Sequence, residues 1–314
     1  MEKNLLYPER FEDFIEMFST ELDCLNYIAL IRWGEMGFSC PKCKGNEVYI
    51  SAKHERCCKT CRQKTSVTAG TVFHRSQKSL RLWFHVMWWM VSQKNGCSAM
   101  NLKNAMNFKS YETAWTWLHK LRNVMVNPSR GKLNGEVEVD ETFLGGSESG
   151  VTGRETESKI LIVVAVEVKN KTMGRIRLQC IKDASAAELM PFIEENVEKG
   201  STVITDGWSS YSTVANKGWM HVVHNISRSK QSASELLPHV HIVISLIKRW
   251  LLGTHQGSVF EKHMQSYLDE FTFRFNRRTS ASRGRLFYRL MQLAVSQQAI
   301  TMDELTGKSL FGDF

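Results

Sequence analysis

Apolar residues recur with two different periods along the chain, and the change from one to the other comes near residue 130. Before that point they follow helical spacing, over residues 1–35 and again in the aromatic-rich segment Leu80–Gln93. From Leu133 onwards, short apolar runs separated by turn residues are typical of β-strands. The sequence Asn-Pro-Ser-Arg-Gly at 127–131 predicts a domain boundary between the two halves.

The second half predicts three strands joined by turns, then a helix and two more strands, and finally helices. The predicted strands are Gly135–Gly146, Ile160–Val168, Arg175–Ile181, Ser201–Asp206 and His221–His224, with a turn-rich segment at Gly145–Ser158 and a helix at Ser185–Lys199. The later helices are predicted from Pro238 to a stop at Gly253, from Ser258 with Glu261 as a capping box to Arg278, and from Arg285 to Gln297.

Two aspartates in these strands are candidate metal ligands. Asp140 lies in an alternation of acids and valines and faces away from Val137 and Val139. A carboxylate held on a rigid strand beside further acids suits Mg²⁺, which takes hard oxygen ligands. Asp206 ends the fourth strand, and the carboxyl end of a strand is the usual place for a catalytic group in an α/β sheet. The alternatives are a half-exposed strand with acids facing water, and an ordinary Asp-Gly turn.

Four cysteines in two Cys-x-x-Cys pairs predict a structural zinc site. Cys40 and Cys43 form the first pair and Cys58 and Cys61 the second, with 14 residues between the pairs. Four thiolates satisfy tetrahedral Zn²⁺, and the metal replaces the hydrophobic core that so short a segment lacks. The gap is slightly shorter than is usual for this pattern, and Cys57 beside Cys58 leaves the third ligand open. Redox disulfides or idle thiols are the alternatives.

The segment between the cysteines and residue 130 predicts helices that resemble a helix-turn-helix. A helix from Ser98 to Asn104, a turn near Asn107 and a helix capped by Ser110 have the required spacing. The last helix of such a motif enters the major groove of DNA through its first residues. A helical connector without a DNA-binding role is the alternative.

Charge and hydropathy favour a soluble protein with a polyanionic partner. The formal net charge is +9 and is spread along the chain, so nucleic acid is the first candidate partner. No basic and apolar leader opens the sequence, and no apolar run reaches the length that spans a membrane. We therefore expect a cytoplasmic protein that has no membrane partner.

The order of these features is similar to that of insertion-sequence DNA transposases of the DDE-type group with an amino-terminal zinc ribbon. Five motifs carry the resemblance, which covers nearly the whole chain: CPKC…CKTC, VEVDETFLGG, VITDGWSSY, SLIKRWLLGTHQGS and YLDEFTFRFNRR. It implies an α/β fold, in which an RNase H-like core with a mixed sheet follows a small zinc ribbon and a helical region. The implied domains are helices at 1–36, the ribbon at 37–75, the helix-turn-helix-like DNA-binding region at 76–130, the catalytic core at 131–280 and a helix and tail at 281–314.

The resemblance implies an enzyme that cleaves DNA and transfers strands at the ends of an insertion sequence. Asp140 and Asp206 would hold Mg²⁺ or Mn²⁺ for in-line attack on a phosphodiester. The implied partners are double-stranded DNA, as the terminal inverted repeats of the element and as target, and further copies of the chain, at least a dimer on DNA. The implied location is the cytoplasm, in association with the nucleoid. A zinc-ribbon DNA-binding protein with a degenerate, inactive RNase H-like domain and a structure-specific nuclease are the alternatives.

The third metal ligand departs from the pattern of the group. Its members usually have glutamate or asparagine seven residues before a basic residue that contacts DNA. Here Lys248 matches the basic residue, and His241 stands seven residues before it. A neutral imidazole can ligate Mn²⁺, although it is a softer ligand than a carboxylate. Three interpretations stay open: a site of two aspartates and a histidine, a weakened copy of the element, or a third ligand drawn from Glu235, Asp269 or Glu270.

The resemblance also assigns DNA contacts to basic side chains on two of the late helices. These residues are Lys248, Arg249, Arg274, Arg277 and Arg278. Asp269 and Glu270 are expected to form salt bridges with the arginines, which would in turn contact phosphate.

Overall fold

The computed structural model describes residues 7–34, 37–127, 129–145, 159–225, 231–256, 259–298 and 300–307. The chain forms two compact units. The first unit comprises residues 1–127 together with 279–314, and the second unit comprises residues 128–278. The predicted turn-rich segment at 145–158 lies almost wholly outside the described residues. No helix within the described ranges is long and apolar enough to cross a membrane.

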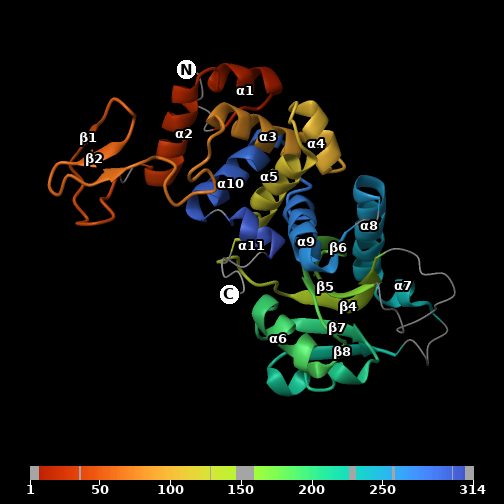
Figure 1. Cartoon of the computed structure of the whole chain (residues 1–314). Helices are drawn as coiled ribbons and strands as arrows, with labels where there is room; N and C mark the ends of the chain where they lie inside the picture. Colours follow the sequence, from red (N-terminus) through yellow and green to blue (C-terminus); the bar gives the residue numbers. More distant parts are fainter. Residues whose placement is uncertain are drawn as a thin grey trace, which may run out of the picture. The chain divides into compact units, whose positions relative to one another are not determined.

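The helices of the first unit form a bundle (Figure 1), and aromatic side chains fill its core. Phe287 is fully buried and packs against Phe14, Phe18 and Phe84, with ring centroids 5.5, 5.6 and 5.7 Å away. The carboxyl-terminal helix α10 therefore completes the core that the first helices begin. The helices are α1 (Phe11–Met17), α2 (Glu21–Trp33), α3 (Leu80–Ser92), α4 (Ala99–Ala105), α5 (Tyr111–Asn123), α10 (Arg283–Ser296) and α11 (Met302–Thr306).

The helix-turn-helix-like spacing corresponds to α4 and α5, which pack against each other. The hydroxyl of Ser98 caps α4 by accepting from the backbone N–H of Asn101, and Ser110 caps α5 in the same way from Thr113. Asn107 between them has φ of 51°, a left-handed conformation that asparagine tolerates better than most residues. DNA binding by α5 stays a prediction.

The cysteine segment forms a small antiparallel sheet of three strands, β1 (Val48–Ile50), β2 (Arg56–Cys58) and β3 (Lys64–Thr65). Val48 pairs with Cys58, so the predicted hairpin returns the chain to the second Cys-x-x-Cys pair.

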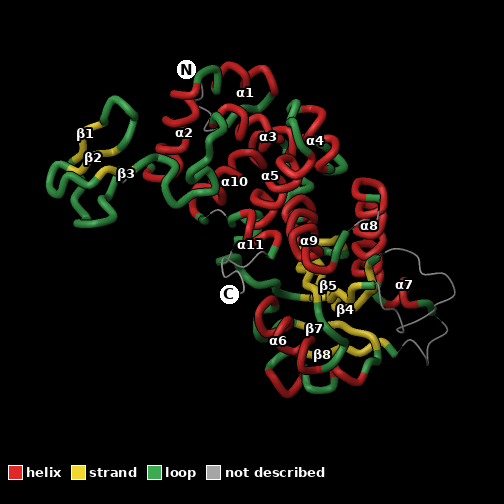
Figure 2. The backbone as a smooth tube through the Cα atoms, in the orientation of Figure 1, coloured by secondary structure: helices red, strands yellow, loops and turns green. Residues whose placement is uncertain are grey.

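The second unit contains a five-stranded mixed sheet in the order β6-β5-β4-β7-β8, drawn in yellow in Figure 2. The central strand β4 pairs antiparallel with β5 and parallel with β7. This is the strand order of an RNase H-like core, and the predicted α/β fold class is confirmed. The elements are β4 (Glu136–Leu144), β5 (Ile160–Lys169), β6 (Thr172–Cys180), α6 (Ala186–Asn196), β7 (Thr202–Asp206), β8 (Met220–His224), α7 (Ala233–Leu236), α8 (Pro238–His255) and α9 (Glu261–Phe275), with short 3-10 helices η1 (Ser209–Tyr211) and η2 (Ala215–Lys217).

Each face of this sheet has its own hydrophobic core. Val137 and Val139 belong to the core beneath α6. Asp140 pairs with Val164, which belongs to the opposite core beneath α8 and α9. Alternation along β4 therefore turns Asp140 away from the two valines, as predicted, and towards the α8 side of the sheet.

A buried carboxylate joins β5, β6 and the segment that precedes β4. The Glu167 side chain is fully buried, and its oxygens accept from Arg175 Nη2 at 2.8 Å and from the Asn134 backbone N–H at 3.2 Å. Burial alone would raise the pKa of Glu167, but these hydrogen bonds outweigh it and lower the pKa to about 2. Gly174 permits this packing, because a Cβ there would lie 2.7 Å from a Glu167 carboxylate oxygen.

Three predicted helix ends are wrong. Helix α8 continues through Gly253 to His255 and ends at Gln256, whose φ of 53° stops it. Gly253 costs an α-helix about 1 kcal/mol relative to alanine, which is too little to end a helix that buries Ile247 and Leu251 in the preceding turns. Helix α6 ends at Asn196, before the predicted Lys199, and α9 ends at Phe275. The predicted cap Ser258 lies outside the described residues.

Candidate active site

A cleft of about 1130 Å³ opens where β4 and β7 separate. Glu138 pairs with Ile204, so the same register places Asp140 level with Asp206 two residues further along. Both aspartates line the cleft, as do Glu141 and Lys248. The structure thus brings three of the four predicted catalytic residues to one cleft.

Asp140 is a buried acid of the cleft with a raised pKa. Its Oδ1 accepts from the backbone N–H of Glu141 at 2.9 Å, and its side chain is 15% exposed. Burial raises the pKa of Asp140 to about 7, and the negative charges of Glu141 and Asp206 add to the effect, while Lys248 opposes it. A nearby cation would favour the ionised form of this carboxyl group.

Glu141 is a further carboxylate in the cleft that the sequence pattern did not single out. Its Oε1 accepts a hydrogen bond of 2.6 Å from the hydroxyl of Tyr211, which is 1% exposed. Burial raises the pKa of Tyr211 well above its ordinary value, and Glu141 raises it further, so the tyrosine stays a donor. The available signal was the position of Glu141 directly beside Asp140. In the alternating pattern, however, Glu141 falls on the same face of the strand as Val137 and Val139, which predicts a side chain that faces the core.

His241 lies beside Asp140 on the first turn of α8. Its Nε2 is 3.5 Å from Asp140 Oδ2, is buried and has no hydrogen-bond partner in the described part of the chain. Burial lowers the pKa of His241, and the positive charge of Lys248 lowers it further, whereas the negative charge of Glu138 raises it. Because the net shift is downward, the imidazole is neutral near pH 7. His241 is not itself among the residues that line the cleft.

The three acids considered as alternatives to His241 have other partners. Glu235 is exposed and accepts from Ser232 at the start of α7. Asp269 accepts from Gln265 at 2.9 Å, and burial raises its pKa to about 6. Glu270 is fully buried and accepts from Arg274 at 2.8 Å. None of these acids lines the cleft.

Glu138 fixes the start of α8 against the central strand. It is 4% exposed and accepts from His239 Nδ1 at 2.6 Å and from the backbone N–H of Val240 at 2.8 Å. A carboxylate at this position also meets the partial positive charge of the helix amino terminus. The sequence did not indicate this contact, which joins residues more than a hundred positions apart.

The basic residues predicted to contact DNA fall into two sets. Lys248 lines the cleft, and Arg249 follows it on the exposed surface of α8. The other three bond groups within α9 or on the strand β6. Arg274 bonds Glu270, Arg277 donates to the Phe273 carbonyl, and Arg278 donates to the carbonyls of Gly174 and Met173. Phosphate contacts by any of these side chains stay a prediction.

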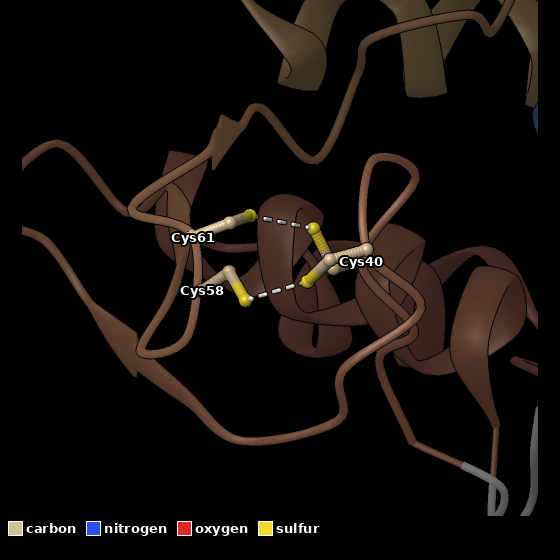
Figure 3. A group of neighbouring side chains, drawn as sticks. Cys40, Cys58 and Cys61 are labelled. Atoms are coloured by element: carbon tan, nitrogen blue, oxygen red, sulfur yellow. Dashed lines mark hydrogen bonds between the residues drawn. The ribbon is translucent and has the colours of Figure 1, made fainter.

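The four predicted cysteines form a separate cluster in the first unit, shown in Figure 3. Their Sγ atoms all lie within 4.8 Å of one another, with 3.5 Å between Cys40 and Cys61 and between Cys43 and Cys58. Cys57 lies outside the cluster and is buried, which settles the choice between it and Cys58. This arrangement can hold a tetrahedral metal ion.

Backbone N–H groups of the two Cys-x-x-Cys turns favour thiolates in this cluster. Those of Cys61 and Thr60 lower the pKa of Cys58 to about 6, and those of Cys43 and Lys42 lower the pKa of Cys40. Although Gly45 donates to its sulfur as well, the crowding thiols of Cys61 and Cys58 raise the pKa of Cys43 to about 12. A divalent cation among the sulfurs would remove that repulsion.

The donor atoms around Asp140 also suit a divalent cation. Asp140 and Asp206 each use Oδ1 for a backbone hydrogen bond, of 2.9 and 3.0 Å, and each has Oδ2 as a second oxygen. The buried Nε2 of His241 adds a nitrogen that has no hydrogen-bond partner among the described residues. Within those residues only the four cysteines are gathered closely enough to share one ion. The two aspartates and the histidine would therefore move closer together around a metal.

Comparison with known proteins agrees with the sequence motifs. Residues 132–276 match the family model described as ISXO2-like transposase domain. A Halobacterium salinarum protein, described as an uncharacterized protein in transposable element ISH50, is 24% identical over an alignment of 290 residues, and the match covers 83% of this chain and 92% of that protein.

Two solved structures of Mos1 transposase, a paired-end complex with the left transposon end and a strand transfer complex, each cover 68% of this chain and 75% of their own. Their sequence identities are 12% and 11% and their TM-scores are 0.31 and 0.30, values too low to support an argument. The family model and the halobacterial relative confirm the predicted resemblance to insertion-sequence transposases, which residues 132–276 carry through their match to the ISXO2-like transposase domain.

Proposed function

We propose that this protein is a transposase that catalyses metal-dependent DNA cleavage and strand transfer at the ends of an insertion sequence. The observation that carries the proposal is the level placement of Asp140 and Asp206 at one cleft of a transposase domain, with His241 beside the first and Lys248 lining the same cleft. A binding protein with an inert domain would need neither aspartate at these positions.

Each residue of the site has a defined role in this proposal. Asp140, Asp206 and His241 would hold Mg²⁺ or Mn²⁺, which lowers the pKa of a bound water or 3′-hydroxyl and stabilises the leaving oxygen. Lys248 neutralises charge on the phosphodiester and positions it in the cleft. The neutral imidazole of His241 offers a lone pair without adding negative charge beside Asp140, whose ionisation is already opposed.

The remaining parts of the chain would recognise the DNA. We propose that the ribbon at 37–75 holds Zn²⁺ through Cys40, Cys43, Cys58 and Cys61 and, with the helical region at 76–130, binds the terminal inverted repeats. The RNase H-like core at 131–280 then acts on the bound ends and on target DNA. Two ends must be joined, so at least two copies of the chain would assemble on DNA in the cytoplasm, at the nucleoid.

The decisive experiment measures Mg²⁺- and Mn²⁺-dependent cleavage of a duplex that carries the ends of the element. Wild type is compared with His241→Ala, His241→Glu and Asp140→Asn. We expect wild type to cut, and Asp140→Asn and His241→Ala to bind the ends without cutting them. Cleavage by wild type of branched or RNA–DNA substrates, but not of the ends, would indicate a structure-specific nuclease. An inert wild type that His241→Glu restores would indicate a weakened copy.

A further inference from the structure

Trp208 lies next to the proposed catalytic acids and has no role in the metal site. It follows Asp206 by two residues, and its backbone N–H donates to Asp206 Oδ1 at 3.0 Å. Its side chain lines the cleft and is 38% exposed. At this exposure, part of the indole surface is open to a ligand that enters the cleft.

The indole ring is held by its edge. Its Nε1 donates to the Ala184 carbonyl at 3.0 Å, and the Ser210 hydroxyl donates to the same oxygen at 2.7 Å. The ring orientation is therefore fixed in relation to Asp206, and a ligand that stacks on the ring would lose little side-chain entropy on binding. Such a preformed aromatic surface suits a flat partner.

The other residues of the cleft indicate which flat partner fits. Lys159, Lys182 and Lys248 line the same cleft, as do the aromatic rings of Phe143 and Phe260, of which Phe260 is 80% exposed. Lysines that neutralise phosphate, interleaved with aromatic rings that stack on bases, are the combination that binds single-stranded nucleic acid. An apolar peptide would leave these lysines and the cleft carboxylates buried without partners.

We infer that Trp208 stacks on an unpaired nucleobase adjacent to the phosphate that the cleft acts on. This inference rests on the proposed function and names the part of the DNA that the site recognises. In an intact duplex each base is covered on both faces by its neighbours, so a base can stack on Trp208 only after it leaves the helix. The site therefore binds its DNA with one nucleotide extruded or frayed at the cleaved position.

A double-mutant cycle between protein and DNA tests the inference. Binding is measured in the Asp140→Asn background, with duplexes of the element ends in which either nucleotide flanking the cleaved phosphate is intact or abasic. Trp208→Ala should weaken binding of the intact duplex by roughly 5- to 100-fold, the range expected for one stacked base. It should cause no further loss on one of the two abasic duplexes, because that duplex has no base to stack. Trp208→Phe keeps a ring face and should retain most of the affinity.

Photocrosslinking supplies an independent readout that a purely structural role would not give. A 5-iodouracil at the nucleotide identified by the cycle should crosslink to Trp208, as mapped by mass spectrometry. Equal loss of affinity on intact and abasic duplexes, or a crosslink elsewhere on the chain, would overturn the stacking role and leave the proposed function in place. Failure of wild type to bind any of these duplexes would overturn both.

Discussion

Removing the carboxylate of Glu138 should impair catalysis from a distance by loosening the first turn of α8. Glu138 accepts hydrogen bonds from Val240 N–H and from His239, the two residues that directly precede the proposed ligand His241. Lys248 lies further along the same helix. The contact therefore sets where two of the four proposed catalytic residues stand in relation to Asp140, although Glu138 itself does not line the cleft.

The structure allows the cost to be worked out. Val240 is fully buried, and in Glu138→Ala its N–H would lose its acceptor in a place that water does not reach. A buried polar group left without a partner costs about 1–3 kcal/mol, and the loss of the hydrogen bond from His239 adds to this cost. Glu138→Gln keeps an oxygen that accepts from Val240 but loses the negative charge at the amino terminus of α8. This variant should therefore lose about 1–2 kcal/mol of stability.

Amide hydrogen exchange and single-turnover cleavage measure the two consequences. A loss of about 3 kcal/mol in Glu138→Ala should lower the protection factors of the first-turn amides of α8 by roughly 100-fold. Cleavage should fall on the order of 10²-fold, the effect of misplacing a catalytic group by about 1 Å, while binding of the DNA ends stays unchanged. Glu136→Gln is the matched control, since Glu136 is an exposed acid on the same strand. A Glu138→Ala variant with wild-type protection and wild-type cleavage would refute the reasoning.

Three further outcomes follow from the described contacts. The pKa of Glu167 is lowered from 4.5 to about 2, so the ionised carboxylate stabilises the fold by up to about 3 kcal/mol above pH 4.5, and this stabilisation is lost as the pH falls towards 2. The difference in β5 protection factors between wild type and Glu167→Gln should therefore shrink over that pH range. A difference that stays constant would contradict the prediction. Cys40→Ser should lose bound zinc and specific end binding, as judged by metal analysis and mobility shift, whereas Cys24→Ser, at a buried cysteine outside the cluster, should lose neither. Tyr211→Phe removes the donor to Glu141 and should slow cleavage and cost about 1–2 kcal/mol; an unchanged cleavage rate would exclude a functional role for this bond.

Local sequence patterns predicted the parts of the fold that depend on local geometry. Alternation along β4 correctly placed Asp140 away from the neighbouring valines. The apolar run before Asp206 was correctly predicted to be a strand that ends at this residue, and it is β7. The spacing of the four cysteines predicted their cluster, because two short turns joined by a hairpin impose it. The order of strands and helices, together with the motifs, was enough to predict the mixed sheet.

Contacts between distant segments could not be predicted in this way. Neither the cap that Glu138 provides to α8 nor the packing of Phe287 among the first helices has a local signal, since each joins segments far apart in the chain. The arginines of α9 show the same limit. Their sequence pattern is that of a phosphate-binding surface, yet Arg278 bonds backbone carbonyls of β6 in the fold.

The presence of Glu141 bears on why histidine is acceptable at position 241. Glu141 and Asp206 share the cleft with Asp140, and burial together with the negative charges of these two acids raises the pKa of Asp140 to about 7. A glutamate in place of His241 would add a further negative charge about 3.5 Å from Asp140, where the imidazole now stands. A neutral nitrogen donor avoids that repulsion, and as a ligand of the proposed metal site it would shift the preference from Mg²⁺ towards Mn²⁺. The histidine at the position of the usual third ligand thus agrees with the local electrostatics, because Glu141 already supplies a further negative charge beside Asp140.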